Sequence, residues 1–111
     1  MITILTKPVP INQKYGVMNG RMLLQKKYRD AKEAIAWEMA AQWQNEPINE
    51  CCALNILFYF GDNRKNDIDN RLKIILDAAE GILFEDDSLV TELHVFKEYD
   101  KENPRVELSV I

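Results

Sequence analysis

An apolar stretch of ten residues, from Cys51 to Phe60, constrains the fold more than any other part of the sequence. Side chains alternate between the two faces of a strand, and here both sets are mostly apolar. One set is Leu54, Ile56, Phe58 and Phe60, and the other is Ala53, Asn55, Leu57 and Tyr59. Because apolar side chains on both faces need cover on both, we predict a strand that is central in its sheet or covered on both sides.

The remaining segments predict three more strands and two helices. Strands are expected at Met1–Thr6, Leu89–Tyr99 and Arg105–Ile111, and helices at about Leu23–Gln44 and from Asp67 or Ile68 to Glu80. Residues 7–20 contain two prolines and two glycines and predict an irregular loop or a loose hairpin. The order β-α-β-α-β-β predicts an α/β fold, with a mixed four-stranded sheet and two main helices in a single small domain over residues 1–111.

The second predicted helix has well-separated faces. At about 100° per residue, the stripe that should face the sheet is Ile68, Leu72, Ile75, Leu76 and Ala79. A polar stripe beside it carries Asp69, Lys73 and Asp77 at steps of four residues, and a third face holds Ile74 and Ala78. Gly81 follows as the expected residue after the helix end.

Composition and missing motifs exclude several classes of protein. The sequence has no apolar run of about 18 residues, so no membrane-spanning helix is expected. The N-terminus lacks the regions of a secretory signal, and the adjacent Cys51 and Cys52 are poorly placed to bridge each other, so we expect a reduced, cytoplasmic setting. The single histidine, His94, argues against a histidine-rich zinc site or a Ser-His-Asp triad.

Acidic residues gather at both ends of the second predicted helix. Asp67 and Asp69 lie where it begins, and Asp86 and Asp87 follow its end. Helix capping would account for one residue of the first pair and partly for the other. If the next strand starts beside the end of the previous one, Asp87 approaches Asp67 and Asp69, and the three carboxylates need a neutralising cation. Carboxylate oxygens suit Mg²⁺ or Mn²⁺, so a metal centre is expected, with capping as the alternative.

Lys73 lies four residues after Asp69 and four before Asp77. As a surface residue it would form ion pairs along the helix that are worth about 0.2–0.5 kcal/mol each. Beside a metal centre it could instead bind the scissile phosphate, stabilise developing charge or orient the attacking water. Asp77, one turn further on, would then support Lys73.

The net charge of −4 conceals an uneven distribution. Residues 1–32 contain seven bases and one acid, whereas residues 33–111 contain seven bases and seventeen acids. A basic segment beside an acidic metal centre suits a polyanion such as DNA, and a solvated basic helix face is the alternative. The expected phosphate contacts are Lys14, Arg21, Lys26, Lys27, Arg29, Lys32, Arg64 and Lys65.

The acidic segment resembles the RusA family of Holliday-junction resolvases. The resemblance lies in Asp67-Ile68-Asp69-Asn70, Lys73 and Asp77, followed by Glu85-Asp86-Asp87 and Val90. The N-terminal part, Pro10-Ile11-Asn12 with Tyr15 and then Tyr28-Arg29, is similar to the family more weakly. The segment Asn63-Arg64-Lys65-Asn66 departs from the run of arginines that the family often carries before its first aspartate.

The resemblance implies a homodimeric, Mg²⁺-dependent endodeoxyribonuclease that nicks four-way DNA junctions symmetrically in recombination and repair, with Mn²⁺ as the alternative ion. It implies catalytic and metal-centre roles for Asp67, Asp69 and Asp87, a catalytic role for Lys73 and a supporting role for Asp86. Two alternatives stay open: a non-catalytic junction-binding module and a nuclease with broader branched-DNA substrates. The presence of all three acids together with Lys73 argues against the non-catalytic module.

A dimer of this kind needs an apolar surface beyond the core of each subunit. We expect it to include Ile74 and Ala78 on the third helix face, together with Trp37 or Trp43.

Overall fold

The computed structural model of the chain describes residues 1–62 and 66–111, apart from the side chain of Arg21. Its strands are β1 (Ile2–Ile4), β2 (Tyr15–Met18), β3 (Arg21–Leu24), β4 (Cys52–Phe60), β5 (Val90–Tyr99) and β6 (Arg105–Val110). Its α-helices are α1 (Lys26–Gln42) and α2 (Ile68–Ala79), and its short 3₁₀ helices are η1 (Ile11–Gln13) and η2 (Asp87–Leu89). Neither α-helix in this part of the chain combines the length and apolarity needed to cross a membrane.

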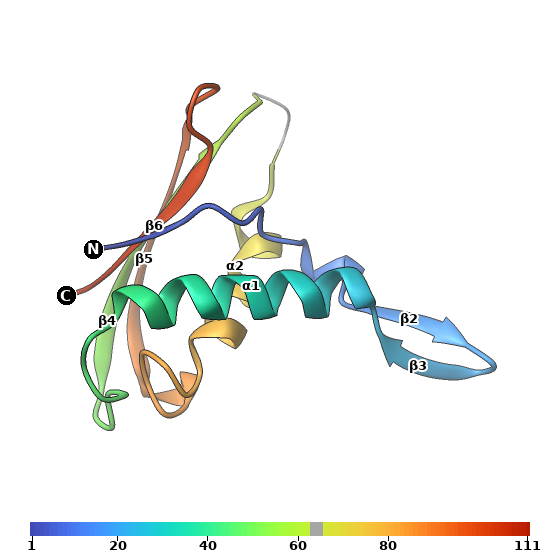
Figure 1. Cartoon of the computed structure of the whole chain (residues 1–111), viewed down its shortest axis with the longest axis horizontal. Coiled ribbons are helices and arrows are strands. Elements are labelled where there is room, and N and C mark those ends of the chain that lie inside the picture. The colour runs from blue at the N-terminus through green and yellow to red at the C-terminus, as the bar shows by residue number, and fades with distance from the viewer. Residues whose placement is uncertain (63–65) are drawn as a thin grey trace.

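Four strands form the main sheet in the order β1-β6-β4-β5, and both helices pack on one side of it (Figure 1). Strand β6 is antiparallel to β1 and β4, whereas β5 is parallel to β4. The predicted mixed four-stranded sheet with two main helices is therefore confirmed. The predicted central position of the strand at 51–60 is confirmed as well, since β4 lies between β6 and β5.

The parallel pairing of β4 and β5 decides where the acidic residues lie. Cys52 pairs with Val90 and Phe60 with Tyr99, so β5 starts beside the start of β4. Two parallel neighbours need a crossover, and α2 supplies it by returning the chain along the sheet. The condition under which Asp87 would approach Asp67 and Asp69, that β5 starts beside the end of β4, is therefore not met, and Asp67 and Asp87 lie beyond opposite ends of α2 in the sequence.

The helices cover only one face of β4. On that face Leu54, Ile56 and Phe58 are buried. On the other face Leu57 and Tyr59 are only partly buried and Asn55 is exposed. The strand is thus central but covered by helices on one side only.

Two faces of α2 are buried because the helix packs against α1 as well as the sheet. Ile74 and Ala78, expected on an outer face, are 0% and 2% exposed, and they form part of one core with Ile75 and Ala79. They cannot form a dimer surface without unpacking the core, so that expectation is wrong. Of the two tryptophans, Trp43 packs partly against the core and Trp37 on α1 is 71% exposed.

The N-terminal third also departs from the prediction. Helix α1 begins at Lys26, and Leu23 and Leu24 belong instead to β3, which pairs with β2 in a second, two-stranded sheet. The turn between them is Asn19-Gly20, with φ of 52° and 76°. Two consecutive positive φ angles define the tight hairpin turn that Asn-Gly favours. The expected loose hairpin is therefore a regular one. Gly81, with φ of 82°, follows α2 as predicted.

Candidate functional site

The carboxylate of Asp77 on α2 is the centre of a polar network that joins three segments of the chain. Its Oδ2 accepts a hydrogen bond of 2.6 Å from the Tyr28 hydroxyl of α1 and one of 3.2 Å from the Lys14 ammonium, which follows η1. Its Oδ1 lies 3.0 Å from the Lys73 Nζ, one turn earlier on α2. The Asp77 side chain is only 11% exposed, so these partners fix its orientation.

The network keeps its members in definite protonation states. Burial alone would raise the pKa of Asp77, but the hydrogen bonds from Tyr28, Lys73 and Lys14 outweigh burial and lower it below its ordinary value. Burial, followed by the hydrogen bond to Asp77, raises the pKa of Tyr28. The bond to Asp77 also raises the pKa of Lys73. At neutral pH the Asp77 carboxylate and the Lys73 ammonium are therefore both charged, and the Tyr28 phenol beside them is neutral.

Lys73 also faces the acidic residues that follow α2. Its Nζ lies 3.6 Å from Oδ2 of Asp87, and its side chain is 42% exposed. Asp77 thus holds the ammonium from one side, and Asp87 lies on the other. A fixed, half-exposed cation beside carboxylates is suited to contact a phosphate that enters from solvent.

Three carboxylates gather where α2 ends. Oxygen atoms of Glu80, Asp86 and Asp87 lie within 4.8 Å of one another. The Asp87 backbone N–H donates to Glu80 Oε1 at 3.1 Å, and Asp86 accepts a 2.9 Å bond from the Ser88 N–H. That bond lowers the pKa of Asp86. Oxygen donors at this spacing fit Mg²⁺ or Mn²⁺.

Of this group, the sequence predicted Asp87 as a ligand and Asp86 as a supporting residue, whereas Glu80 was not among the candidate site residues. In the sequence Glu80 is one more polar residue on the polar stripe of the second predicted helix. Its approach to Asp87 depends on the turn at residues 81–86, where the Gly81 N–H donates to the Phe84 carbonyl at 2.8 Å. The fold of that turn has no periodic signal in the sequence.

Asp67 and Asp69 lie at the other end of α2. Asp67 occupies the N-cap position, but its side chain makes no capping bond and accepts instead from the Asn70 side chain at 3.3 Å. Asp69 is exposed in the first turn, and its carboxylate has no partner in the described part of the chain. The twelve residues of α2 span about 18 Å. In residues 1–62 and 66–111, no group of three carboxylates with this spacing joins Asp67 or Asp69 to Asp87.

The predicted phosphate contacts lie in different environments. Lys14 is tied to Asp77 and is only 17% exposed. On α1, Lys26 pairs with Asp30 at 3.4 Å, Lys27 donates to the Gln13 side chain at 3.2 Å, and Arg29 is exposed. Lys32 on the same helix is partly buried. Arg64, Lys65 and the side chain of Arg21 lie outside the described part of the chain.

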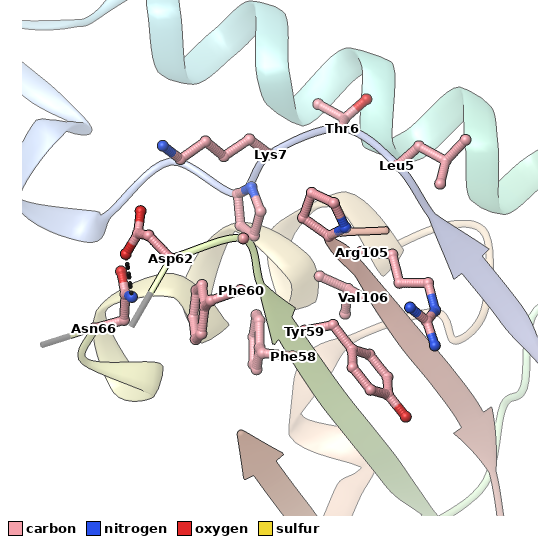
Figure 2. A pocket seen from close by; sticks show the side chains of 13 residues that line it. Leu5, Thr6, Lys7, Phe58, Tyr59, Phe60, Asp62, Asn66, Arg105 and Val106 are labelled. Atoms are coloured by element: carbon pink, nitrogen blue, oxygen red, sulfur yellow. Dashed lines mark hydrogen bonds between the residues drawn. The ribbon is translucent and has the colours of Figure 1, made fainter. Parts of the chain in front are cut away.

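A cavity of about 190 Å³ lies away from these carboxylates, between the N-terminal segment and the ends of β4 and β6 (Figure 2). The parallel rings of Phe58 and Phe60 form one wall, with centroids 5.9 Å apart. The cavity is smaller than the roughly 300 Å³ of typical ligand pockets. None of the predicted catalytic residues lines it. Glu80 and Asp86 are exposed and the Lys73 side chain is 42% exposed, so these groups face solvent, which suits a polymer more than a small molecule.

An α/β domain with carboxylates around a half-exposed lysine on an open surface is typical of enzymes that act on phosphodiesters. The family model for Endodeoxyribonuclease RusA matches residues 6–111. The chain therefore belongs to the RusA family of endodeoxyribonucleases, which confirms the resemblance seen in the sequence. A relative from Aquifex aeolicus (strain VF5), Crossover junction endodeoxyribonuclease RusA, is 28% identical over 97 residues, covering 85% of this chain and 76% of the relative.

Proposed function

We propose that this chain is a metal-dependent endodeoxyribonuclease that resolves four-way DNA junctions by paired symmetric nicks, in recombination and repair in the cytoplasm. The observation that carries the proposal is the position of the Lys73 ammonium, 3.0 Å from Asp77 and 3.6 Å from Asp87. Family membership supports the nuclease class, and the name of the A. aeolicus relative, a crossover junction endodeoxyribonuclease, supports the junction as substrate.

The proposed ion is Mg²⁺, with Mn²⁺ as the alternative. The hard oxygen donors of Glu80, Asp86 and Asp87 fit either ion. When bound, such an ion supplies an activated water and neutralises phosphate charge. Asp67 and Asp69 are proposed as further ligands. Asp69 lies one turn before Lys73 on the polar stripe of α2, and the Lys73 Nζ lies 3.6 Å from Asp87.

Within the chain, Lys73 is proposed to bind a non-bridging oxygen of the scissile phosphate. Asp77 holds the ammonium in place, and Lys14 and Tyr28 hold Asp77 from its other oxygen. Because the Asp77 carboxylate also accepts from Lys14 and Tyr28, its ion pair with Lys73 does not fully neutralise the Lys73 ammonium. The ammonium can therefore still bind a phosphate. The carboxylate of Asp86 supports the turn that carries Asp87 by accepting from the Ser88 N–H.

The duplex arms are proposed to lie against the basic residues of the N-terminal third. The candidates are the eight predicted residues, among which Arg29 is exposed and forms no ion pair in the described part of the chain. Paired nicks at symmetric positions need two sites at a fixed separation, so we propose a two-fold homodimer.

A synthetic four-way junction, incubated with Mg²⁺ or with EDTA, tests the proposal. We expect nicks at symmetric positions on two opposing strands in Mg²⁺ and none in EDTA. Junction binding without cleavage in Mg²⁺ and Mn²⁺ would favour the non-catalytic binding module. Equal cleavage of three-way junctions and flaps would favour a nuclease with broader branched-DNA substrates.

A further inference from the structure

The cavity at the end of β4 has a buried floor and an exposed rim. Phe58 and Val106 on the floor are each 1% exposed, whereas Lys7, Asp62 and Pro104 around the rim are exposed. The N-terminal segment that carries Lys7 passes beside the ends of the strands (Figure 2). The cavity therefore opens to solvent and can admit a group that enters from outside the molecule.

One wall of the cavity is flat and aromatic. The rings of Phe58 and Phe60 are inclined to each other by 4°, with centroids 5.9 Å apart. The guanidinium carbon of Arg71 lies 5.6 Å from the Phe60 centroid, and Arg71 also donates to the Pro8 carbonyl at 2.6 Å. These contacts join the aromatic wall to the N-terminal segment on the other side of the cavity. Ordered, parallel rings of this kind offer a surface on which another planar group can stack.

The volume of the cavity fits one planar ring system. A cavity of about 150 Å³ lined by apolar side chains is large enough to bind benzene, and this one measures about 190 Å³. Drug-sized ligands occupy pockets of roughly 300 Å³ or more. The cavity is therefore suited to a single flat heterocycle such as a nucleobase.

The rim has the charge and the position that a bound nucleotide needs. Lys7 is exposed and forms no ion pair within residues 1–62 and 66–111, so its ammonium is available to a phosphate. Asn66 lines the cavity, and the predicted metal ligand Asp67 follows it directly. From Asp67 to Lys73 helix α2 rises about 9 Å. Since a nucleotide of duplex DNA advances about 3.4 Å, a base in the cavity would lie about three nucleotides from a phosphate at Lys73.

We propose that this cavity takes up one base of the DNA junction after that base has left its stack. The inference rests on the proposed junction-cleaving function, which supplies DNA as the ligand, and it adds a base-binding subsite to the phosphate contact at Lys73. Unstacking costs less at a branch point than inside a regular duplex. Stacking on Phe60 and a phosphate contact from Lys7 offset that cost. A base held in the cavity would fix the register of its strand relative to Lys73.

The test uses 2-aminopurine, a base whose fluorescence is quenched by stacking on its neighbours in DNA. It is placed singly at each position within about four nucleotides of the branch point, and the junction is saturated with protein in EDTA, which prevents cleavage. At one position the wild type should raise the emission several-fold. Phe60→Ala removes a stacking ring and should abolish this rise. Phe96→Ala, at a 54% exposed position on β5 outside the cavity, is the matched control and should keep it.

A second variant fills the cavity instead of emptying it. A Cβ added at Gly61 would lie 3.4 Å from Pro104 on the rim, so Gly61→Leu should narrow the entrance while both phenylalanine rings stay in place. This variant should also abolish the fluorescence rise, and both variants should bind the junction roughly tenfold more weakly. If Phe60→Ala fails to fold by circular dichroism, Gly61→Leu decides.

No rise at any position with the wild type overturns the proposal, and so does an undiminished rise with Gly61→Leu. Cleavage measured in Mg²⁺ separates this inference from the proposed function. A wild type that nicks the junction without any fluorescence rise removes the base site and keeps the nuclease. A rise that is lost in the cavity variants, with no nicking by the wild type in Mg²⁺ or Mn²⁺, keeps the base site and removes the nuclease.

Discussion

The Asp77 network and the β2–β3 hairpin, residues 15–24, are connected through Lys14, but they differ in how far their side chains are covered by the rest of the chain. At Asp77, donors from three segments of one subunit surround a buried carboxylate. On the β2–β3 hairpin, Tyr15, Val17, Met22 and Leu24 remain exposed. The side chains of the network are thus partnered within the chain, whereas these apolar side chains are not covered by it. Substitutions around Asp77 should therefore change turnover or folding, and substitutions of these hairpin side chains should leave the core unchanged.

The largest effect is expected for Asp87→Asn, which keeps the shape of the side chain and removes an anionic ligand. Cleavage of the four-way junction should fall roughly 10³-fold, while junction binding in EDTA is kept or strengthened because less negative charge faces the DNA. Asp67→Asn and Asp69→Asn should lower cleavage to a similar extent if carboxylates at both ends of α2 bind the metal. Glu92→Gln, an exposed acid on β5, is the control. Wild-type rates in all three variants would remove the metal assignment.

Lys73→Ala should lower turnover roughly 10²-fold, because a positioned cation is lost from the phosphate. Its stability should change by only about 0.5 kcal/mol, since its ion pairs lie on a half-exposed helix face. Single-turnover rates and urea denaturation measure the two effects, with Lys101→Ala in the exposed turn before β6 as the control. A small rate loss with a large drop in Tm would show a structural salt bridge instead.

Tyr28→Phe removes one donor from Asp77 and should lower the free energy of unfolding by about 1.5–3 kcal/mol at pH 7. The folded-state pKa of Asp77 is lowered, so its stabilisation is present above its unfolded pKa of about 3.9 and is lost as pH falls through the folded value. The difference from wild type should therefore shrink below about pH 4. Urea denaturation at pH 7 and pH 3 measures it, beside Tyr99→Phe on exposed β5. A stability difference between Tyr28→Phe and wild type that does not change with pH would show that the hydrogen bond to the Asp77 carboxylate does not account for it.

The smallest effect is expected in the salt dependence of junction binding. If Arg29 contacts a phosphate, Arg29→Ala should reduce the slope of log K against log salt by about 0.9. Lys14→Ala should change the slope less, because Asp77 already holds the Lys14 ammonium at 3.2 Å. Equal slopes for wild type and Arg29→Ala, from titrations at several salt concentrations, would remove Arg29 from the DNA surface.

Local signals in the sequence were sufficient for much of the fold. Ile75 and Ala79 of the predicted stripe of α2 are buried, and its other three residues pack partly buried against the core. The alternation of Val106 and Leu108 in β6 and the glycine after α2 are confirmed. The start of α1 was wrong because Leu24 continues the helical spacing of Tyr28 and Ala31, while the Asn19-Gly20 turn places Leu24 in a strand. Where two local patterns overlap, the pairing of β2 with β3 decides between them.

The sequence by itself determined which chemical groups this protein carries: Asp67, Asp69, Lys73, Asp77 and Asp87, with the family to which their spacing belongs. Only the tertiary structure decided which of them meet. Tyr28 and Lys14 reach Asp77 across 49 and 63 residues of chain, and the parallel pairing of β4 with β5 separates Asp67 from Asp87. Periodicity reports the faces of one element, because it depends on backbone geometry within that element. The pairing of distant elements depends on the packing of the whole core, which no local pattern encodes.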